Sequence, residues 1–435
     1  MPTRVDTASS LLGGAVHTSP RLRECHDCGQ LQVIPALPPA TRAICLRCDG
    51  VLRHTAHDPY RLPLALYSTA LILLTIGAAM VLLTVSNGGR QRSATLFTGP
   101  LGLEHYGLWA LSIVVLVTTF AAPLFRVGAM ITVLAGLRLR HPPPFLRVLF
   151  AWDQRLRPWA MIEVYLLGIF VAYVRLTLIV HLEIGTALYA LGLLMLIMVG
   201  ADFALDRQAV WEAMDVRGMG DYARKRRAGA LGASLHRLGC GTCGLVSRAV
   251  NGAICPRCGF TLRSRKPDSL ARTWAFAIAA LIMYIPANLY PVLTVVRLGA
   301  GTPSTILGGA QELLDLGEWP LALLVFFASI AVPVLKLLVL TFLLITTHLG
   351  QATRLRDRTT LFRFVDFIGR WSMIDVFMIS ILVALVQFGA VATVRPGPGS
   401  VPFAAVVILT MFAAASFDPR LMWDAGTHPG TQNER

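Results

Sequence analysis

The chain has 435 residues, of which 55% are hydrophobic and only 14% are charged, and its formal net charge is +15 at pH 7. Soluble domains average about 25% charged residues, so this composition excludes an ordinary soluble protein and predicts an integral membrane protein. A nucleic-acid role is not expected, because the positive charge gathers in the short loops between apolar segments, where it sets membrane orientation and meets lipid headgroups.

The first sixty residues contain no segment typical of a signal peptide, since the apolar piece "LLGGAV" is short and is followed by cysteines. We therefore expect the N-terminus to stay in the cytoplasm. Residues 1–20 are predicted to be a flexible N-terminal segment. Residues 21–58 are predicted to form a small β zinc ribbon.

All eight cysteines fall in CxxC pairs, two pairs before the apolar segments begin and two pairs in the middle of the chain, within residues 236–266. Each pair brings two thiolates to one metal, and two pairs complete a closed tetrahedral site suited to zinc. We predict two structural zinc ions, one per ribbon. The ligands are Cys25, Cys28, Cys45 and Cys48 in the first ribbon and Cys240, Cys243, Cys255 and Cys258 in the second.

The sequence around the cysteines fits zinc ribbons, because Gly directly follows the second Cys in "CHDCGQ", "CGTCGL" and "CPRCGF", where positive φ is often needed. In "CLRCDG" Asp49 comes first. An iron–sulfur centre and a redox dithiol stay open as alternatives. Structural disulfides are disfavoured by the expected cytoplasmic location.

A membrane-spanning helix needs about 20 apolar residues, and eight such segments follow. They lie at about 64–85, 108–137, 159–181, 184–205, 273–296, 319–347, 371–394 and 401–417, the last being short. We expect kinks in the second and sixth, which contain Pro123 and Pro333. The predicted domains are a four-helix repeat at 59–214, a basic linker at 215–235, the second ribbon at 236–266, a second four-helix repeat at 267–424, and a flexible tail at 425–435.

Arginines predict the orientation of these spans. Five arginines lie between spans two and three, five more lie between spans six and seven, and "RKRR" at 224–227 lies in the linker, whereas the opposite loops contain few cations. By the positive-inside rule both termini, the linker, both ribbons and the arginine-rich loops are cytoplasmic.

The two halves of the chain repeat each other. "WAMIEVYLLGIFVAYVRL" at 159–176 recurs as "WSMIDVFMISILVALVQF" at 371–388, with eight of eighteen positions identical. Asp206 and Trp211 recur as Asp418 and Trp423 at the same offset of 212. Because each half has four spans, an even number, the halves share one orientation and form a parallel repeat. We expect pseudo-twofold packing about the membrane normal.

Ionisable residues within spans are costly and usually face a bundle interior or a wet cavity. Arg126 and Lys336 each lie three residues after a proline, and Glu163 and Asp375 lie about one turn into the next span. We expect a cation–anion pair in each half. The second half also offers Ser329, Ser372 and Thr410. This polar cluster is interpreted either as a structural clasp or as a site where protonation of Lys336 is coupled to a conformational change.

The halves differ at the first span of each repeat. The second repeat has Pro286, Asn288 and Pro291 in "YIPANLYPVL", where the first repeat has the ordinary apolar "IGAAMV" at 76–81. We interpret the three residues as a helix-break motif and the second half as the more functional one.

Taken together, the two ribbons, the two four-span repeats and four further stretches resemble the paraquat-inducible protein A family. These stretches are "YIPANLYPVL", "GEWPLALLVFFASIAVPVLKL" at 317–337, "WSMIDVFMISILVALV" at 371–386 and "FDPRLMWD" at 417–424. The resemblance implies an inner-membrane partner of a periplasmic MCE-domain protein that forms a hydrophobic tunnel for phospholipids. It also implies a tetraspanin- or claudin-like packing of each four-helix repeat.

The predicted fold is thus a polytopic all-α membrane protein of two parallel four-helix repeats, each preceded by a β zinc ribbon. The predicted function is an inner-membrane component of an MCE-type lipid transport system in a bacterial envelope. The alternative is a membrane-anchored zinc-ribbon sensor or recruitment protein. We do not expect an enzyme or direct use of ATP, because the chain has no recognisable Ser-His-Asp pattern and no Walker A sequence.

Overall fold

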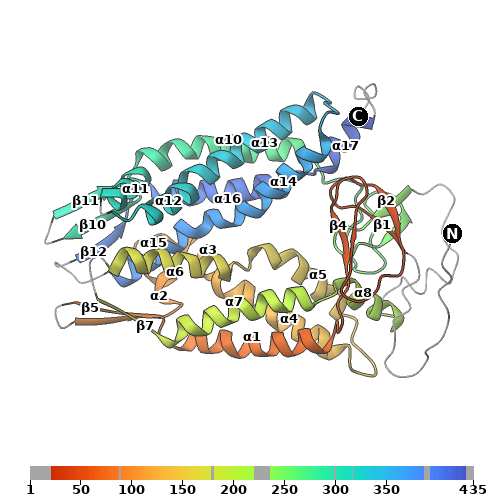
Figure 1. Cartoon of the computed structure of the whole chain (residues 1–435), viewed down its shortest axis with the longest axis horizontal. Coiled ribbons are helices and arrows are strands. Elements are labelled where there is room, and N and C mark those ends of the chain that lie inside the picture. The colour runs from red at the N-terminus through yellow and green to blue at the C-terminus, as the bar shows by residue number, and fades with distance from the viewer. Residues whose placement is uncertain are drawn as a thin grey trace.

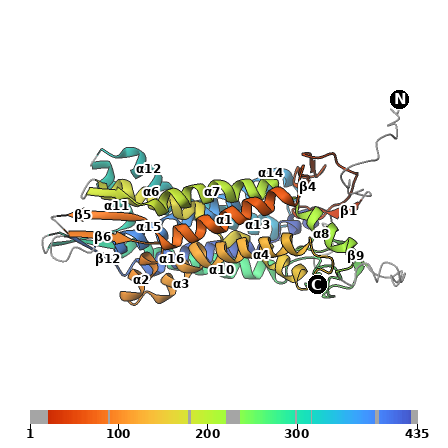
Figure 2. The same ribbon diagram turned by 90° about the horizontal axis from the view of Figure 1, so that it is seen from below.

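The computed structural model describes residues 21–87, 90–177, 181–219, 236–297, 300–315, 317–386 and 392–427. Two bundles of long helices lie side by side, one for each half of the chain (Figure 1). Small β ribbons cover one end of the bundles and three-stranded sheets cover the other, as a view turned by 90° also shows (Figure 2). We call these the ribbon end and the sheet end. The predicted flexible segment at 1–20, residues 428–435 of the predicted tail at 425–435 and residues 220–235 of the predicted linker at 215–235 lie outside the described residues, whereas residues 425–427 of that tail belong to the last helix.

Each half repeats the same order of helices. In the first half these are α1 (Arg61–Ala79), α2 (Thr98–His105), α3 (Trp109–Leu116), α4 (Ala122–Gly136), α5 (Leu146–Leu156), α6 (Ile162–Thr177), α7 (Thr186–Ala204) and α8 (Arg207–Val216). In the second half they are α10 (Ser269–Leu289), α11 (Ile306–Asp315), α12 (Trp319–Phe326), α13 (Val332–His348), α14 (Leu355–Gly369), α15 (Ile374–Leu385), α16 (Ser400–Ser416) and α17 (Arg420–Thr427).

Seven helices among the described residues are long and apolar enough to cross a membrane, and Ser400–Ser416 is a shorter apolar helix in the eighth position. Short turns join several neighbouring helices into single spans, such as Trp109–Gly136 and Leu355–Leu385. Within each half the first and last spans pack together, α1 against α7 and α10 against α16. The predicted polytopic membrane fold is confirmed.

The predicted ends of four spans are wrong, because strands begin where the helices stop. At the sheet end of the first half, β5 (Leu83–Asn87) pairs with β6 (Arg90–Ala94) and β7 (His181–Ile184). In the second half, β10 (Leu293–Arg297) pairs with β11 (Ala300–Ser304) and β12 (Ala392–Pro396). Strand residues such as "LTVV" keep hydropathy high, so hydropathy alone extends the helices into the sheets.

The two expected proline kinks coincide with π-helical turns. One turn of π-helix at Val117–Ala121 joins α3 to α4, and another at Phe327–Ala331 joins α12 to α13. Pro123 and Pro333 lie in the first turn of the helix that follows. Proline cannot donate to the preceding turn, and a π turn is one way for the chain to accommodate this.

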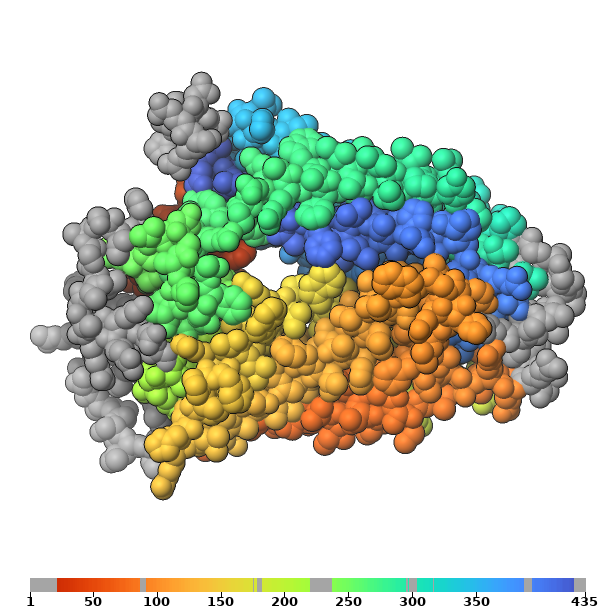
Figure 3. Space-filling view, turned by 180° about the vertical axis from the view of Figure 1, so that it is seen from behind, coloured from red at the N-terminus to blue at the C-terminus, as the bar shows by residue number. Residues whose placement is uncertain are grey.

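The repeated stretch described above forms the contact between the halves. α6 and α15, which have equivalent positions in the two repeats, pack against each other. Tyr165 meets its counterpart Phe377 edge to face, with ring centroids 5.5 Å apart. A Cβ on Gly168 would lie only 3.0 Å from Cβ of Phe377, so this contact requires glycine. Such contact between equivalent helices is what a pseudo-twofold axis between the halves would produce. Nearer the ribbon end, the space-filling view shows an opening between the two halves (Figure 3).

Candidate transport site and metal centres

The cation of the first repeat belongs to a buried ion network. Arg126, only 4% exposed, pairs with Asp202 of α7 and lies 3.7 Å from Asp153 of α5. Asp202 also accepts hydrogen bonds from Arg157 (3.2 Å) and from the hydroxyl of Tyr67 (3.3 Å). The network therefore ties α1, α4, α5 and α7 together near the ribbon end.

Glu163, the expected partner of Arg126, lines the same small cavity as Arg126, but the recorded ion pairs of Arg126 go to Asp202 and Asp153. Two features of the sequence point to these partners. Asp202 is the only carboxylate in the apolar part of its span, and Asp153 lies among the arginines of the preceding loop.

Most of this network is absent from the second repeat. At an offset of 212, Arg157 becomes Gly369, Asp202 becomes Ala414 and Arg207 becomes Pro419. Lys336, the counterpart of Arg126, is 1% exposed. Its Nζ donates to the carbonyl oxygen of Gly369 (2.8 Å) and to Thr410 Oγ1 (3.4 Å).

Among the described residues, the Lys336 ammonium is thus held by a carbonyl and a hydroxyl and not by a carboxylate. Gly369 makes this possible, because a Cβ there would lie 2.9 Å from Lys336 Cε. The structure therefore brings Lys336 and Thr410 of the predicted cluster into contact, through a position that in the first repeat bears an arginine.

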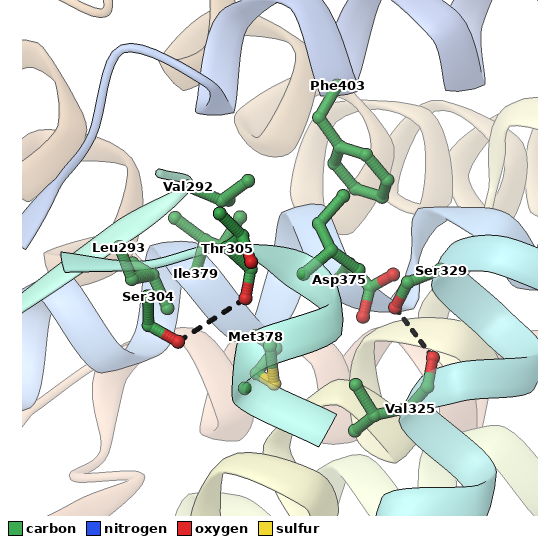
Figure 4. Close-up of a pocket in the computed structure, with 12 residues that line it drawn as sticks. Val292, Leu293, Ser304, Thr305, Val325, Ser329, Asp375, Met378, Ile379 and Phe403 are labelled. Atoms are coloured by element: carbon green, nitrogen blue, oxygen red, sulfur yellow. Dashed lines mark hydrogen bonds between the residues drawn. The ribbon is translucent and has the colours of Figure 1, made fainter. Parts of the chain in front are cut away.

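Asp375 and Ser329 line a cavity in the second repeat (Figure 4). Its volume is about 30 Å³, room for about two water molecules. Leu293 and Ser304 of the sheet also line it, together with Thr305 and Phe403. Ser329 lies in the π turn and donates to the carbonyl oxygen of Val325 (2.7 Å). The cavity thus connects two buried polar groups with the sheet end.

Ser372, the fifth predicted member, is fully buried in the short turn between α14 and α15, and its Oγ has no hydrogen-bond partner among the described residues. It lies three residues after Gly369 and three before Asp375. One short segment of chain therefore supplies the acceptor for Lys336, a buried hydroxyl and the carboxylate of the cavity.

The predicted helix-break motif lies at the sheet end of α10. Pro286 is inside the helix, which continues to Leu289. The side-chain amide of Asn288 donates to the carbonyl oxygen of Tyr284 (2.8 Å), and Pro291 follows the helix end. The carbonyl oxygen of Pro291 accepts from Gly399 N (2.9 Å), at the start of α16. The helix ends at Leu289 and not at Pro286, and Pro291 leads into the strand beside the cavity.

The eight cysteines form two buried sets of four, and within each set the Sγ atoms all lie within 4.8 Å of one another. The closest pairs are Cys25–Cys48 and Cys240–Cys258 at 3.5 Å, and Cys28–Cys45 and Cys243–Cys255 at 3.6 Å. A disulfide needs about 2.05 Å, so these are not disulfides. Four sulfurs at about 2.3 Å from a tetrahedral zinc would lie about 3.8 Å apart, so both sets can bind a metal of this kind.

The turns after the cysteines have the backbone that the spacing predicts. Gly29, Gly244 and Gly259 have φ of +70°, +66° and +81°. Asp49 adopts +57° itself, so it replaces glycine in the fourth turn.

The thiolates of the first set also have hydrogen-bond donors. Gln32 Nε2 lies 3.1 Å from Cys45 Sγ, and Arg363 Nη2 of α14 lies 3.3 Å from Cys48 Sγ. These features favour the thiolate form that binds metal.

Each ribbon packs against the membrane half that it does not precede. The first ribbon is built on β1 (Arg21–Glu24), β2 (Leu31–Ile34), β3 (Arg42–Ile44) and β4 (Val51–His54). Its Asp27 accepts from Arg363 Nε of α14 (2.8 Å), and its Arg47 lies 4.4 Å from the ring of Trp423 in α17. Both contacts are with the second half.

The second ribbon, which contains β8 (His236–Gly239) and β9 (Val246–Ala249), meets the first half. Arg257, the counterpart of Arg47, donates to Asp215 (3.1 Å), and Arg155 lies 3.9 Å from the ring of Phe260. Each ribbon is also tied to its own half, through Arg53 to Asp206 and Glu212 and through Arg265 to Asp424. We call this arrangement the cross-packed ribbons.

A comparison with protein-family models matches residues 61–215 and 270–426, well over half of the chain, to "Paraquat-inducible protein A". The chain belongs to the paraquat-inducible protein A family. The two matched segments correspond to the two membrane halves of the structure.

Curated relatives in this family match most of the chain. It is 33% identical over 411 residues to "Intermembrane transport protein PqiA" of Escherichia coli, covering 92% of this chain and 95% of the relative. It is 30% identical over 403 residues to "Lipophilic envelope-spanning tunnel protein A" of Escherichia coli, covering 93% and 91%. It is 26% identical over 419 residues to "Probable intermembrane transport protein" of Haemophilus influenzae, covering 93% and 97%. No solved structure matches this chain.

Replacement of Arg126 by leucine is expected to lower the free energy of unfolding by about 3–5 kcal/mol, because Asp202 and Asp153 would lose their buried cation. Lys336→Leu should lower it less, since the recorded hydrogen-bond partners of Lys336 among the described residues are a carbonyl and a hydroxyl and no ion pair with a carboxylate is recorded for it there. Thermal unfolding of both variants in detergent checks this. An equal decrease in the free energy of unfolding in the two variants would contradict a special stabilising role of the carboxylate network around Arg126.

Proposed function

We propose that this protein is the inner-membrane component of an MCE-type lipid transport system, and that it loads or extracts phospholipid for a periplasmic tunnel-forming partner. The names of its relatives, which refer to intermembrane transport and to an envelope-spanning tunnel, support this proposal. We infer that the ribbon end faces the cytoplasm, because the arginine-rich loops lie there. The sheet end would then face the periplasm and the partner.

The single observation on which the proposal rests is the cavity of the second repeat. It is lined by Leu293, Ser304 and Thr305 at the sheet end and by Asp375 and Ser329 inside the membrane span. Ionisable groups within a bilayer are rare and usually mark a pathway or a proton relay. A small cavity that reaches them from the sheet end is the feature expected of a gated lipid route.

The polar cluster supplies the coupling in this proposal. Lys336 donates to the carbonyl oxygen of Gly369 and to the hydroxyl of Thr410. A neutral amine can still donate to the carbonyl and can accept from the hydroxyl, so both hydrogen bonds can persist when the ammonium loses a proton. Lysine in apolar surroundings changes its protonation state readily. We infer that protonation of Lys336 shifts the turn that contains Gly369 and Ser372, and with it the cavity at Asp375. The metal centres would be zinc, and they would maintain the ribbons without taking part in transport.

Photo-crosslinking at Thr305 tests the route. A benzophenone side chain at this cavity-lining position is expected to crosslink phospholipid in living cells, and to do so more strongly when the periplasmic partner is present. Thr95, the counterpart of Thr305 in the first repeat at an offset of 210, is the matched control. Equal crosslinking at both positions, or crosslinking to phospholipid at neither, would contradict a route through the second repeat.

A further inference from the structure

A second cavity lies at the ribbon end of the first half, with a volume of about 450 Å³. This volume is within the range of about 300–1,000 Å³ that is typical of ligand sites. Its walls come from the first ribbon and from the junction of α7 with α8. The charged residues that line it are Arg42, Arg53, Arg157, Arg207, Asp202 and Asp206.

The lining is rich in cations, with four arginines and a histidine against two aspartates. Both aspartates already have partners. Asp202 forms ion pairs with Arg126 and Arg157. Asp206 caps the N-terminus of α8 and forms an ion pair with Arg53. The cavity therefore offers more positive charge than its own carboxylates neutralise.

Of the cavity arginines that have a recorded ion pair, Arg207 has the most distant partner. Its only recorded partner among the described residues is Asp202, at 4.0 Å. Burial and then the neighbouring charge of Arg157 lower the pKa of Arg207, which means that its cationic form is disfavoured by its surroundings. Arg42 is exposed on β3 and has no recorded partner in the described chain. Arg53 Nε is buried and also has no hydrogen-bond partner there. An anion in the cavity would give these arginines a negatively charged hydrogen-bond acceptor.

The cavity also has an apolar edge at the membrane boundary. Phe203 lies in the last turn of α7, at the ribbon-end terminus of the span Thr186–Ala204, and is 62% exposed. A ligand with a charged group inside the cavity and an apolar part outside it would cover Phe203. A free inorganic anion would leave it exposed. The second half lacks such a site, since Gly369, Ala414 and Pro419 replace Arg157, Asp202 and Arg207.

We propose that this cavity binds a phosphate-bearing anion, and that the ligand is the headgroup of an anionic phospholipid of the inner leaflet. Arginine pairs of this kind recognise phosphate oxygens by bidentate hydrogen bonds. Basic pockets on the cytoplasmic side of membrane helices are suited to anionic headgroups. The bound lipid holds the first ribbon against the first half and is not the transported one. The site is separate from the transport route, so it stands or fails independently of the proposed function.

The test is lipid binding by the purified full-length protein. Thermal unfolding and native mass spectrometry are measured with phosphatidylglycerol, with phosphatidylcholine and with inorganic phosphate. The test variant is Arg42→Gln with Arg207→Gln. The control is Arg138→Gln with Arg140→Gln, which removes two exposed arginines from the loop after α4, outside the cavity. The single variant Arg42→Glu, at an exposed strand position, provides a second measurement if the double variant folds poorly.

We expect phosphatidylglycerol to be retained and to raise the melting temperature, with apparent affinity about tenfold weaker or more in the test variant and unchanged in the control. Arg42→Glu should show an intermediate loss. Equal loss in test and control variants would overturn the site in favour of general surface charge. Binding of phosphatidylcholine as strong as that of phosphatidylglycerol would overturn an anion site. Full stabilisation by inorganic phosphate alone would overturn the lipid as its ligand.

Discussion

Lys336→Ala is expected to reduce transport at least tenfold while the protein remains at nearly normal levels in the membrane. The variant loses one ammonium whose partners are the carbonyl of Gly369 and the hydroxyl of Thr410, so no buried carboxylate among the described residues loses its counterion. The unsatisfied carbonyl costs about 1–3 kcal/mol. Complementation of a strain sensitised to defects in outer-membrane lipid homeostasis measures the function, and immunoblotting measures the level.

Two further variants separate transport from structure. Thr410→Val removes the hydroxyl partner at nearly constant volume and should weaken transport less than Lys336→Ala. The double variant Lys336→Ala with Asp375→Ala should also fail in transport. If the double variant regains function, the two residues act as a structural clasp and the proposed protonation step is wrong.

Loss of one metal centre is the second large effect. Cys25→Ser with Cys28→Ser is expected to remove one of two zinc ions per chain and to destabilise the second membrane half more than the first, to which Arg53 also ties this ribbon. The physical reason is the contact of this ribbon with Arg363 and Trp423 of the second half. Structural zinc contributes about 10–16 kcal/mol in small zinc-finger peptides, so the ribbon should unfold without it.

Cys240→Ser with Cys243→Ser is the matched variant. It should increase hydrogen exchange mainly in the first half, around Phe150 and Trp211. Metal analysis and hydrogen exchange of the two halves are the measurements. Iron at either centre would overturn the zinc assignment. Destabilisation of the same half in both variants would contradict the cross-packed ribbons as the cause.

The elements with a strong repeated pattern could be predicted from the sequence. Long apolar runs gave the helices, and CxxC spacing gave the two four-cysteine sets, because both patterns are set by local geometry. The sheets were missed because short strands such as Leu293–Arg297 differ little in hydropathy from a helix end.

The partners of buried charges could be predicted only in part. Lys336 and Thr410 were expected in one cluster and are in contact. Arg126 was expected to pair with Glu163, one span ahead, but its carboxylates come from α5 and α7. Pairing depends on which helix faces lie together, and spacing along the chain does not determine this. The replacement of Arg157 by Gly369 could have indicated the difference between the halves, because glycine leaves room for a lysine to reach the backbone.

The cross-packed ribbons have a consequence for biosynthesis. Asp27 and its partner Arg363 are 336 residues apart. At about 5–20 residues per second, a ribosome needs roughly 17 to 67 s to make the segment between them. During that interval the first ribbon exists without the surface on which it finally rests. If zinc binds the four cysteines as proposed, it would keep the ribbon folded during this interval, and the zinc supply during translation would then affect how the helices made last dock onto the ribbon.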